Sequence, residues 1–232
     1  PNLRLFTFME KIMKTAILVD GGFYRRRAQI MIGEKSAEER AKELDNYCRR
    51  HLSEKNQGKH ELYRIFYYDC PPMDKKVYHP FLKKQVDFSK SDLNIWMTQF
   101  LDELKKHRKF ALRLGKLADA QACYTLRPQV VKKICNGKVT FNDLKEEDFM
   151  IDVDQKGVDM KIGLDIASMA YKKQVDQIVL ISGDSDFVSA AKLARREGID
   201  FVLDPLGAPI KDDLFEHIDG LRTCDSQYIV NK

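Results

Sequence analysis

A chain of 232 residues, of which 44% are apolar and 32% charged, has the length and composition of a globular protein with a sizeable core. The formal net charge of +5 permits a polyanionic partner without demanding one, and no apolar run approaches the ~20 residues that a membrane-spanning helix requires. We therefore expect no membrane association. Five cysteines, none in a C-x-x-C pair, argue against a disulfide framework or a thiolate zinc site, so we expect a reducing, cytoplasmic setting.

The predicted elements alternate between strands and helices along the chain. Residues 1–13 lack the cleavage site of a signal peptide and are treated as an N-terminal extension. Runs of apolar and β-branched residues predict strands at 15–20, 62–69, 110–115, 177–182 and 199–204, with a further candidate at 121–129. Apolar residues at helical spacing predict helices at 37–53, 89–108, 156–173 and from 187 to about 198.

This alternation predicts an α/β fold with right-handed βαβ units and a mostly parallel sheet. The strands are apolar almost throughout, which fits a central sheet covered by helices on both faces. We expect residues 14–232 to form a single domain, with less regular insertions near 69–88 and 116–156.

Aspartates follow the ends of the predicted strands. Asp20 ends the first strand, and Asp184 and Asp186 follow the strand at 177–182. Asp159 lies in the first turn of its predicted helix. If that helix starts at the edge of the sheet where these strands end, Asp159 adds a fourth carboxylate there. Because ligands of an open parallel sheet bind outside the carboxyl ends of its strands, we expect these carboxylates to converge on one edge.

A cluster of this kind has a characteristic chemistry. Neighbouring carboxylates repel each other and raise each other's pKa, so the cluster survives best around a hard cation. Mg²⁺ and Mn²⁺ take oxygen ligands and leave water positions open for substrate phosphates. One or two such ions can activate a water and stabilise the charge on a phosphodiester. The arrangement therefore predicts a metal-dependent nuclease.

Simpler structural roles compete for each of these residues. Asp184 could cap a helix, Asp159 could complement a helix dipole, and Asp20 could be a turn residue. Capping can explain any one of these aspartates. It explains less well why three of them occur at strand ends and helix starts of the same chain. Asp69, which precedes Cys-Pro-Pro, is expected to be a loop residue. Asp165 is expected to form an exposed salt bridge with the residue four positions before it, Lys161.

Three segments resemble the NYN domain family, within the PIN-like nuclease group: AILVDGG at 16–22, KGVDMKIGLDIA at 156–167 and VLISGDSDFVSAAKLARREG at 179–198. Their order and spacing match over about residues 14–206, and the LabA-like bacterial subgroup is the most similar. The resemblance implies a PIN-like, Rossmann-like three-layer α/β/α sandwich. It also implies an acidic pocket that binds Mg²⁺ or Mn²⁺ and hydrolyses RNA, which we expect to make the protein an endoribonuclease.

By this resemblance, Asp20, Asp159, Asp184 and Asp186 are the catalytic and metal-binding residues, and Asp165 is a second-tier metal ligand. The family's first motif often reads V-D-G-x-N, whereas this chain has Phe23 at the last position. A polar group near the metal is therefore missing or supplied elsewhere.

Several side chains near the predicted edge are candidates for holding RNA. The candidates for substrate contacts are Ser182, Ser185, Lys156, Lys161, Arg25, Arg26 and Arg27. For the two serines, capping the following helix is the stronger interpretation. The basic residues would grip phosphates, which positions RNA without reading its sequence. Tyr24 or Phe23 could stack on a base, although core packing is the stronger expectation for Phe23.

Two other functions stay open. One is a non-catalytic RNA-binding or regulatory module, motivated by Phe23 and the moderate charge. The other is a different Mg²⁺-dependent Rossmann-like phosphohydrolase. A haloacid-dehalogenase phosphatase, however, needs D-x-D at the end of its first strand, where this chain reads Asp20-Gly21-Gly22. An unpaired edge strand or a surface helix could support a homodimer.

Overall fold

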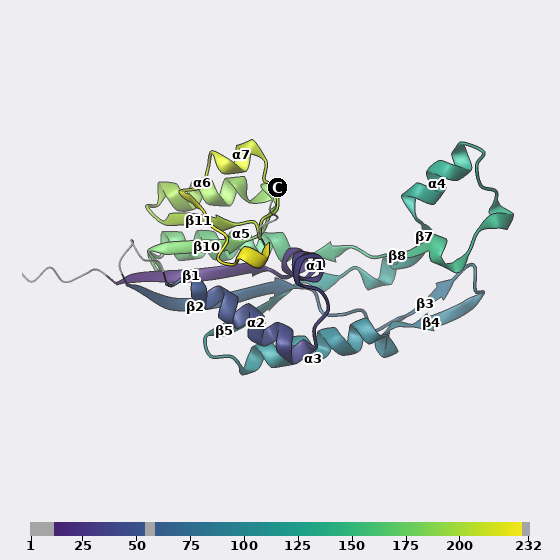
Figure 1. Cartoon of the computed structure of the whole chain (residues 1–232), viewed down its shortest axis with the longest axis horizontal. Coiled ribbons are helices and arrows are strands. Elements are labelled where there is room, and N and C mark those ends of the chain that lie inside the picture. Colours follow the sequence, from purple (N-terminus) through teal and green to yellow (C-terminus); the bar gives the residue numbers. More distant parts are fainter. Residues whose placement is uncertain (1–11, 54–58, 229–232) are drawn as a thin grey trace, which may run out of the picture. The chain divides into compact units, whose positions relative to one another are not determined.

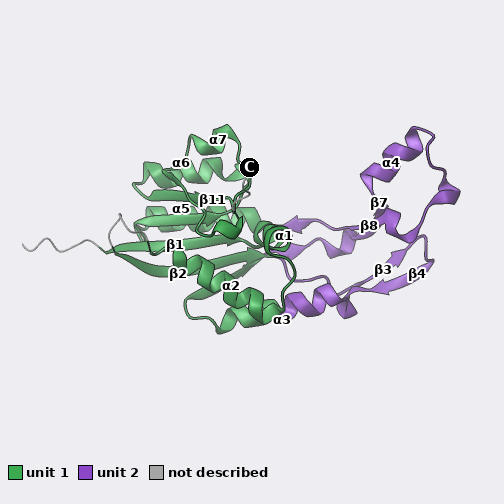
Figure 2. Cartoon of the chain, in the orientation of Figure 1, with its two compact units in different colours: residues 1–69, 100–114, 158–232 green, residues 70–99, 115–157 purple. Residues whose placement is uncertain are grey.

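The computed structural model describes residues 12–53 and 59–228, and the chain forms two compact units (Figure 2). Unit 1 comprises residues 1–69, 100–114 and 158–232, and unit 2 comprises residues 70–99 and 115–157. The predicted extension at 1–13 lies almost wholly outside the described residues. The segments predicted to be insertions, near 69–88 and 116–156, fall almost wholly in unit 2 and fold with each other.

Unit 1 is built on a sheet of six parallel strands in the order β12-β11-β10-β1-β2-β5 (Figure 1). β1 and β10 pair at its centre, with Val19 opposite Ile181. Every residue of 16–19 in β1 and of 177–181 in β10 is buried, which is the pattern of strands covered on both faces. In chain order the strands are β1 (Met13–Asp20), β2 (His60–Asp69), β5 (Phe110–Leu114), β10 (Gln177–Ile181), β11 (Asp200–Asp204) and β12 (Gly220–Leu221).

Helices cover both faces of this sheet. Two successive residues of β2 mark the faces: the Tyr68 hydroxyl donates to Asp165 of α5 (2.8 Å), whereas the Tyr67 ring packs edge-on against Phe100 of α3, with 5.6 Å between ring centroids. α6 contacts α5 and β11 on the Tyr68 face. The predicted three-layer α/β fold is therefore confirmed. The helices are α1 (Gly21–Ile32), α2 (Ala37–Arg50), α3 (Asp92–Lys106), which begins in unit 2 and ends in unit 1, α5 (Val158–Tyr171), α6 (Val188–Arg196) and α7 (Asp212–Phe215).

Helix α1 was not expected from the sequence, where Gly-Gly after Asp20 reads as a simple strand stop. The helix instead begins at once, and Asp20 caps it by accepting a hydrogen bond from the Phe23 backbone N–H (3.0 Å). Gly21 is needed for close packing, because a Cβ there would lie 2.5 Å from the Tyr67 hydroxyl oxygen. The cap stabilises the start of the helix, and the contact with Tyr67 excludes any larger residue, so glycine occurs here in spite of its poor helix propensity.

The other predicted elements of unit 1 begin and end within a few residues of their expected limits. At the start of α2, Ser36 accepts a hydrogen bond from the Glu39 backbone N–H (3.2 Å), and the Glu39 carboxylate accepts one from the Ser36 N–H (3.1 Å). This capping box explains the sharp start of the helix.

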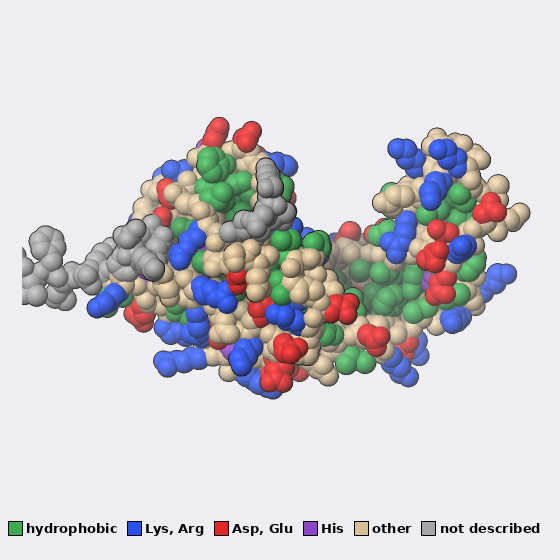
Figure 3. Space-filling view, in the orientation of Figure 1, with side chains coloured by type: hydrophobic (Ala, Val, Ile, Leu, Met, Phe, Trp, Pro, Cys, Tyr) green, Lys and Arg blue, Asp and Glu red, His purple; other side chains and the backbone are tan. Residues whose placement is uncertain are grey.

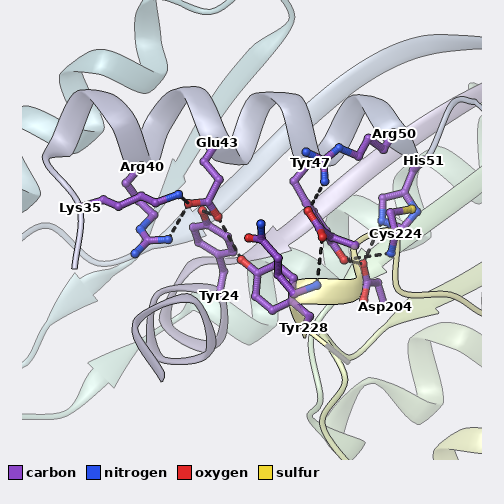
Figure 4. Close-up of polar contacts among 12 residues, drawn as sticks. Tyr24, Lys35, Arg40, Glu43, Tyr47, Arg50, His51, Asp204, Cys224 and Tyr228 are labelled. Atoms are coloured by element: carbon purple, nitrogen blue, oxygen red, sulfur yellow. Dashed lines mark hydrogen bonds and ion pairs between the residues drawn. The ribbon is translucent and has the colours of Figure 1, made fainter. Parts of the chain in front are cut away.

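A buried polar network joins α2 to the end of β11 (Figure 4). Asp204 is completely buried, and its Oδ2 accepts from the Tyr47 hydroxyl (2.5 Å) and lies 2.9 Å from His51 Nε2. Its Oδ1 accepts from the Leu206 backbone N–H (2.8 Å) and the Thr223 hydroxyl (3.0 Å). Burial raises the pKa of Tyr47, and the negative Asp204 raises it further, so the phenol stays a neutral donor.

A second carboxylate extends the network along α2. Glu43 Oε2 accepts from Lys35 Nζ (2.9 Å) and from the Arg40 guanidinium (2.7 Å), while Oε1 accepts from the Tyr228 hydroxyl (3.1 Å). Tyr228 belongs to η6 (Ser226–Tyr228), so the network ties the C-terminal segment to α2 (Figure 4).

Unit 2 contains short antiparallel strand pairs around a small aromatic core. The His79 ring centroid lies 4.1 Å from that of Tyr124 and 5.4 Å from that of Phe149, and Phe81 lies 5.8 Å from Phe149. The strand expected at 121–129 is shorter, because Pro128 opens a helix. The paired strands are β3 (Lys76–His79) with β4 (Lys84–Asp87), β6 (Lys116–Leu117) with β9 (Gln155–Lys156), and β7 (Cys123–Leu126) with β8 (Phe149–Asp152). The helices are α4 (Pro128–Cys135) and the 3₁₀ turns η1 (Phe88–Lys90), η2 (Asp119–Gln121), η3 (Phe141–Asp143) and η4 (Glu146–Asp148).

All five cysteines lie in the described ranges and are free thiols. None of the helices in those ranges combines the length and apolar character that crossing a bilayer demands.

Candidate functional site

The ends of β1 and β10 are joined by a hydrogen bond between two predicted site residues. The Ser182 hydroxyl donates to Asp20 Oδ2 (3.1 Å) and accepts from the Asp184 backbone N–H (3.3 Å). Ser182 is completely buried. With its Oδ1 fixed by the cap of α1 and its Oδ2 by Ser182, the Asp20 carboxylate is held in place from two sides.

The loop after β10 forms a tight turn that presents the next two aspartates. Asp184 Oδ1 accepts from the Asp186 backbone N–H (3.0 Å), and the turn η5 covers Ser185–Phe187. Asp184 therefore also has the capping role that its position suggested. Ser185 Oγ accepts from Lys211 Nζ (3.0 Å), which reaches the loop from the segment after β11.

The four aspartates affect one another electrostatically. Burial raises the pKa of Asp20 and the charge of Asp159 raises it further, against the hydrogen bonds from Phe23 and Ser182 and the positive charge of Arg26. Burial also raises the pKa of Asp159, as do the charges of Asp184 and Asp186. Asp159 thus interacts with the carboxylates that follow both β1 and β10. We call Asp20, Asp159, Asp184 and Asp186 the acidic site.

The chemistry of the acidic site fits a hard divalent cation. Its donors are carboxylate oxygens, and two of them have a raised pKa because negative charge and burial are incompletely compensated. Within residues 12–53 and 59–228, no three His, Cys, Asp or Glu side chains are close enough together to enclose one ion. The metal-binding and catalytic roles of the four aspartates stay predictions.

Asp165 is occupied by other partners. Its Oδ2 accepts from the Tyr68 hydroxyl (2.8 Å) and from Arg113 Nε (3.0 Å), and the Arg113 guanidinium lies 5.3 Å from the centroid of the Phe66 ring. The predicted salt bridge between Lys161 and Asp165 was therefore wrong, because Asp165 pairs instead with Arg113 of β5. Such non-local pairing leaves no pattern in the sequence of α5.

The three consecutive arginines of α1 have different roles. Arg25 forms a two-point ion pair with Asp69, from Nε to Oδ2 (2.9 Å) and from Nη2 to Oδ1 (3.1 Å). Asp69 is a buried strand-end residue, not the loop residue expected, since it also accepts from the Tyr67 hydroxyl (2.9 Å). Arg27 donates to the Leu206 carbonyl (2.8 Å). Arg26 is exposed, and its charge acts on Asp20.

The remaining candidates divide between the units. Lys161 is exposed on α5 of unit 1, and Lys156 belongs to β9 of unit 2. Lys211 was missed, because it lies in an irregular segment and only its contact with Ser185 marks it. The sequence feature that could have identified Lys211 is its position after β11, the strand that pairs with β10.

Phe23 packs at the acidic site itself. A Cβ on Gly183 would lie 2.8 Å from Phe23 Cε2, so the ring lies directly against the backbone between Ser182 and Asp184. Phe23 was expected to pack in the core. Its ring does pack against the backbone, but the residue is only partly buried. Tyr24, the other stacking candidate, is completely buried.

We expect Gly183→Ala to destabilise the protein by about 1–3 kcal/mol, the usual cost of an added methyl group in a filled space. The double variant Phe23→Ala/Gly183→Ala should recover part of that loss, because the ring that clashes is gone. Urea unfolding of wild type, both single variants and the double variant measures the coupling. Additive effects of the two substitutions would contradict this contact.

Comparison with known proteins identifies the family of the chain. The NYN domain family matches residues 85–209, which include Asp159, Asp184 and Asp186, whereas Asp20 precedes the match. One solved structure that resembles the chain is that of a protein of unknown function, VPA0982, from Vibrio parahaemolyticus RIMD 2210633. It is 14% identical, with 94% of this chain and 97% of that chain covered and a TM-score of 0.48. No curated protein matches. Because the family match covers more than half of the residues, the chain belongs to the NYN domain family, a family of PIN-like nucleases.

Proposed function

We propose that this protein is a metal-dependent endoribonuclease that uses the acidic site. The observation that carries the proposal is that Ser182 bonds both to Asp20, at the end of β1, and to the backbone of Asp184, after β10, in a chain of a nuclease family. The charges of Asp20, Asp184 and Asp186 each act on Asp159 at the same edge. Mg²⁺ or Mn²⁺ bound among Asp20, Asp159, Asp184 and Asp186, whose side chains would have to draw closer together to enclose it, would supply an activated water and neutralise charge on the scissile phosphodiester. The finer assignment to the LabA-like subgroup belongs to the same proposal.

The surrounding residues support this chemistry in distinct ways. Ser182 positions Asp20 and the backbone of the Asp184 loop through its two hydrogen bonds. Arg26 and Lys211 place positive charge beside Asp20 and Ser185, where a phosphate of the RNA backbone would bind. Arg25 and Arg27 act through the fold instead, because their guanidinium groups bond to Asp69 and to the Leu206 carbonyl.

A non-catalytic RNA-binding module is the second candidate, and Phe23 favours it. The family often carries Asn at this position, and here a ring lies against Gly183 in the acidic site. A polar side chain that could bind water or substrate is thus replaced by an apolar surface.

The direct test is RNA cleavage as a function of metal. Purified protein is incubated with end-labelled structured and single-stranded RNA in Mg²⁺, Mn²⁺ or EDTA. We expect internal cleavage with either ion and none in EDTA, with recovery when excess Mg²⁺ is added back. The matched controls are Asp184→Asn, which should not cleave, and Asp225→Asn, an aspartate whose ion-pair partner is Arg50 of α2 and which should cleave normally.

RNA binding without cleavage under every metal condition would favour the non-catalytic module instead. Cleavage that continues in EDTA would contradict the metal requirement. Cleavage by Asp184→Asn at the wild-type rate would show that the acidic site is not the catalytic centre.

A further inference from the structure

The β3–β4 hairpin of unit 2 has an outward face that the proposed chemistry does not use. β3 (Lys76–His79) alternates exposed and buried residues, so Val77 and His79 face inward and Lys76 and Tyr78 face outward. Tyr78 pairs with Gln85 of β4, which is also exposed. The inward face anchors the hairpin in the aromatic core through His79. The outward face is therefore not required for the packing of unit 2.

The hairpin is basic. Between residues 76 and 87 the chain has three lysines and one aspartate, Asp87, and Asp74 and Asp92 flank this stretch. Lys75 pairs with Asp119 (2.9 Å), and Lys76 lies 3.9 Å from Asp87. No carboxylate among the described residues pairs with Lys83 or Lys84 at the turn, and both are exposed. On the face of unit 2 drawn in Figure 3, lysine and arginine side chains stand beside aspartate and glutamate side chains. The lysines of the hairpin are Lys76, Lys83 and Lys84, and Lys75 and Lys90 lie just outside it.

Two aromatic rings stand among these charges. Tyr78 is 51% exposed, and Phe81, whose ring also packs against Phe149, is 43% exposed. Proteins that bind single-stranded nucleic acid combine a basic surface, which follows the phosphates, with exposed rings on which bases stack. A double helix hides its base faces, so only unpaired bases could use both features.

We propose that the β3–β4 hairpin binds single-stranded RNA, with Lys83 and Lys84 on phosphates and Tyr78 stacked on a base. This inference rests on the proposed function, because it names the substrate class of the same protein as unpaired RNA. The alternation of lysines with exposed rings favours this partner, because the phosphates of RNA carry the opposite charge and its unpaired bases can stack on the rings.

The test is a binding titration in EDTA, which separates binding from cleavage. The probe is fluorescently labelled oligouridine, with a stable RNA duplex as competitor, and the salt concentration is varied. The variants are Lys83→Ala/Lys84→Ala and the matched control Lys132→Ala/Lys133→Ala, which removes two exposed lysines from α4 of the same unit. Tyr78→Ala is compared with Tyr78→Phe, which keeps the ring.

If the hairpin binds RNA, Lys83→Ala/Lys84→Ala should lower the slope of log K against log salt by about 1.4, since each phosphate contact contributes about 0.7 on a single strand. The α4 control should keep the wild-type slope. Tyr78→Ala should weaken binding about 5- to 150-fold, whereas Tyr78→Phe should bind like wild type. The duplex should compete poorly.

Equal slopes for the hairpin and α4 variants, or wild-type affinity of Tyr78→Ala, would overturn the inference. So would hairpin-dependent binding to phosphatidylserine vesicles with no binding to oligouridine. The hairpin proposal and the nuclease proposal can fail separately. If the protein cleaves RNA normally and binding does not depend on the hairpin, only the hairpin proposal is rejected. If binding depends on the hairpin and no RNA is cleaved, only the nuclease proposal is rejected.

Discussion

Asp20→Asn should reduce metal-dependent RNA cleavage by about 10³-fold or more. The charge that a bound metal neutralises is worth several kcal/mol, and each ~1.4 kcal/mol is a factor of ten in rate. Asp20 interacts with both Asp159 and Ser182, so it belongs to the centre of the acidic site. The measurement is the single-turnover rate at saturating Mg²⁺.

Asp165→Asn is the matched control for this prediction. It makes the same chemical change in unit 1, but Asp165 already bonds to Tyr68 and Arg113, so its loss should leave the rate within about tenfold of wild type. If both variants lost the same amount of cleavage activity, Asp165 would belong to the catalytic centre, and its separation from the acidic site would be wrong.

The inactive variant should also remain folded. Asn caps helices about as well as Asp, so the start of α1 survives the substitution. Burial raises the pKa of Asp20, which means that ionising it in the folded protein is unfavourable without metal. In EDTA, Asp20→Asn should therefore melt at a higher temperature than wild type. A lower melting temperature would show that lost cleavage reflects lost folding.

The largest effect on stability is expected for Asp204→Ala, at about 3–5 kcal/mol, because breaking a buried charge network leaves its partners unpaired. The carboxylate accepts from Tyr47, Leu206 and Thr223 and lies against His51, and none of it reaches solvent. Urea unfolding monitored by circular dichroism gives the free energy of unfolding.

A second aspartate near the same network supplies the control. Asp225 pairs with Arg50, whose side chain is 48% exposed, so Asp225→Ala should cost no more than about 1 kcal/mol. Asp204→Asn keeps the shape and one acceptor oxygen and should fall between the two. If Asp204→Ala and Asp225→Ala were equally stable, the buried network would not be a main support of unit 1.

Much of unit 1 could be predicted from sequence because its signals are local. Runs such as AILV at 16–19 and IVLI at 178–181 identify buried parallel strands, and the aspartates that follow them mark the carboxyl edge. The order of strands across the sheet is not local, yet it places the ends of β1 and β10 side by side. The candidate site depended on that adjacency and on Asp159 at the start of α5.

The features that could not be predicted depend on contacts between distant residues. Helix α1 was hidden by two glycines, whose role becomes clear only beside Tyr67. The pairing of Arg25 with Asp69 joins residues 44 positions apart, and both were expected to have other roles. Lys211 bonds to Ser185 from an irregular segment. Unit 2 has short strands and an aromatic core that leave only weak periodicity in the sequence.

The pairing of β1 with β10 has a consequence for the protein during its synthesis. Asp20 and Ser182 are hydrogen-bonded across 162 positions of the chain, and β10 must enter the sheet before that bond can form. A ribosome therefore releases β1 long before its central partner exists, and the late, long-range closure is the slow kind of folding step. Until then the growing polypeptide carries Asp20 without Asp184 and Asp186. A chain that ends before β10 thus has no assembled acidic site.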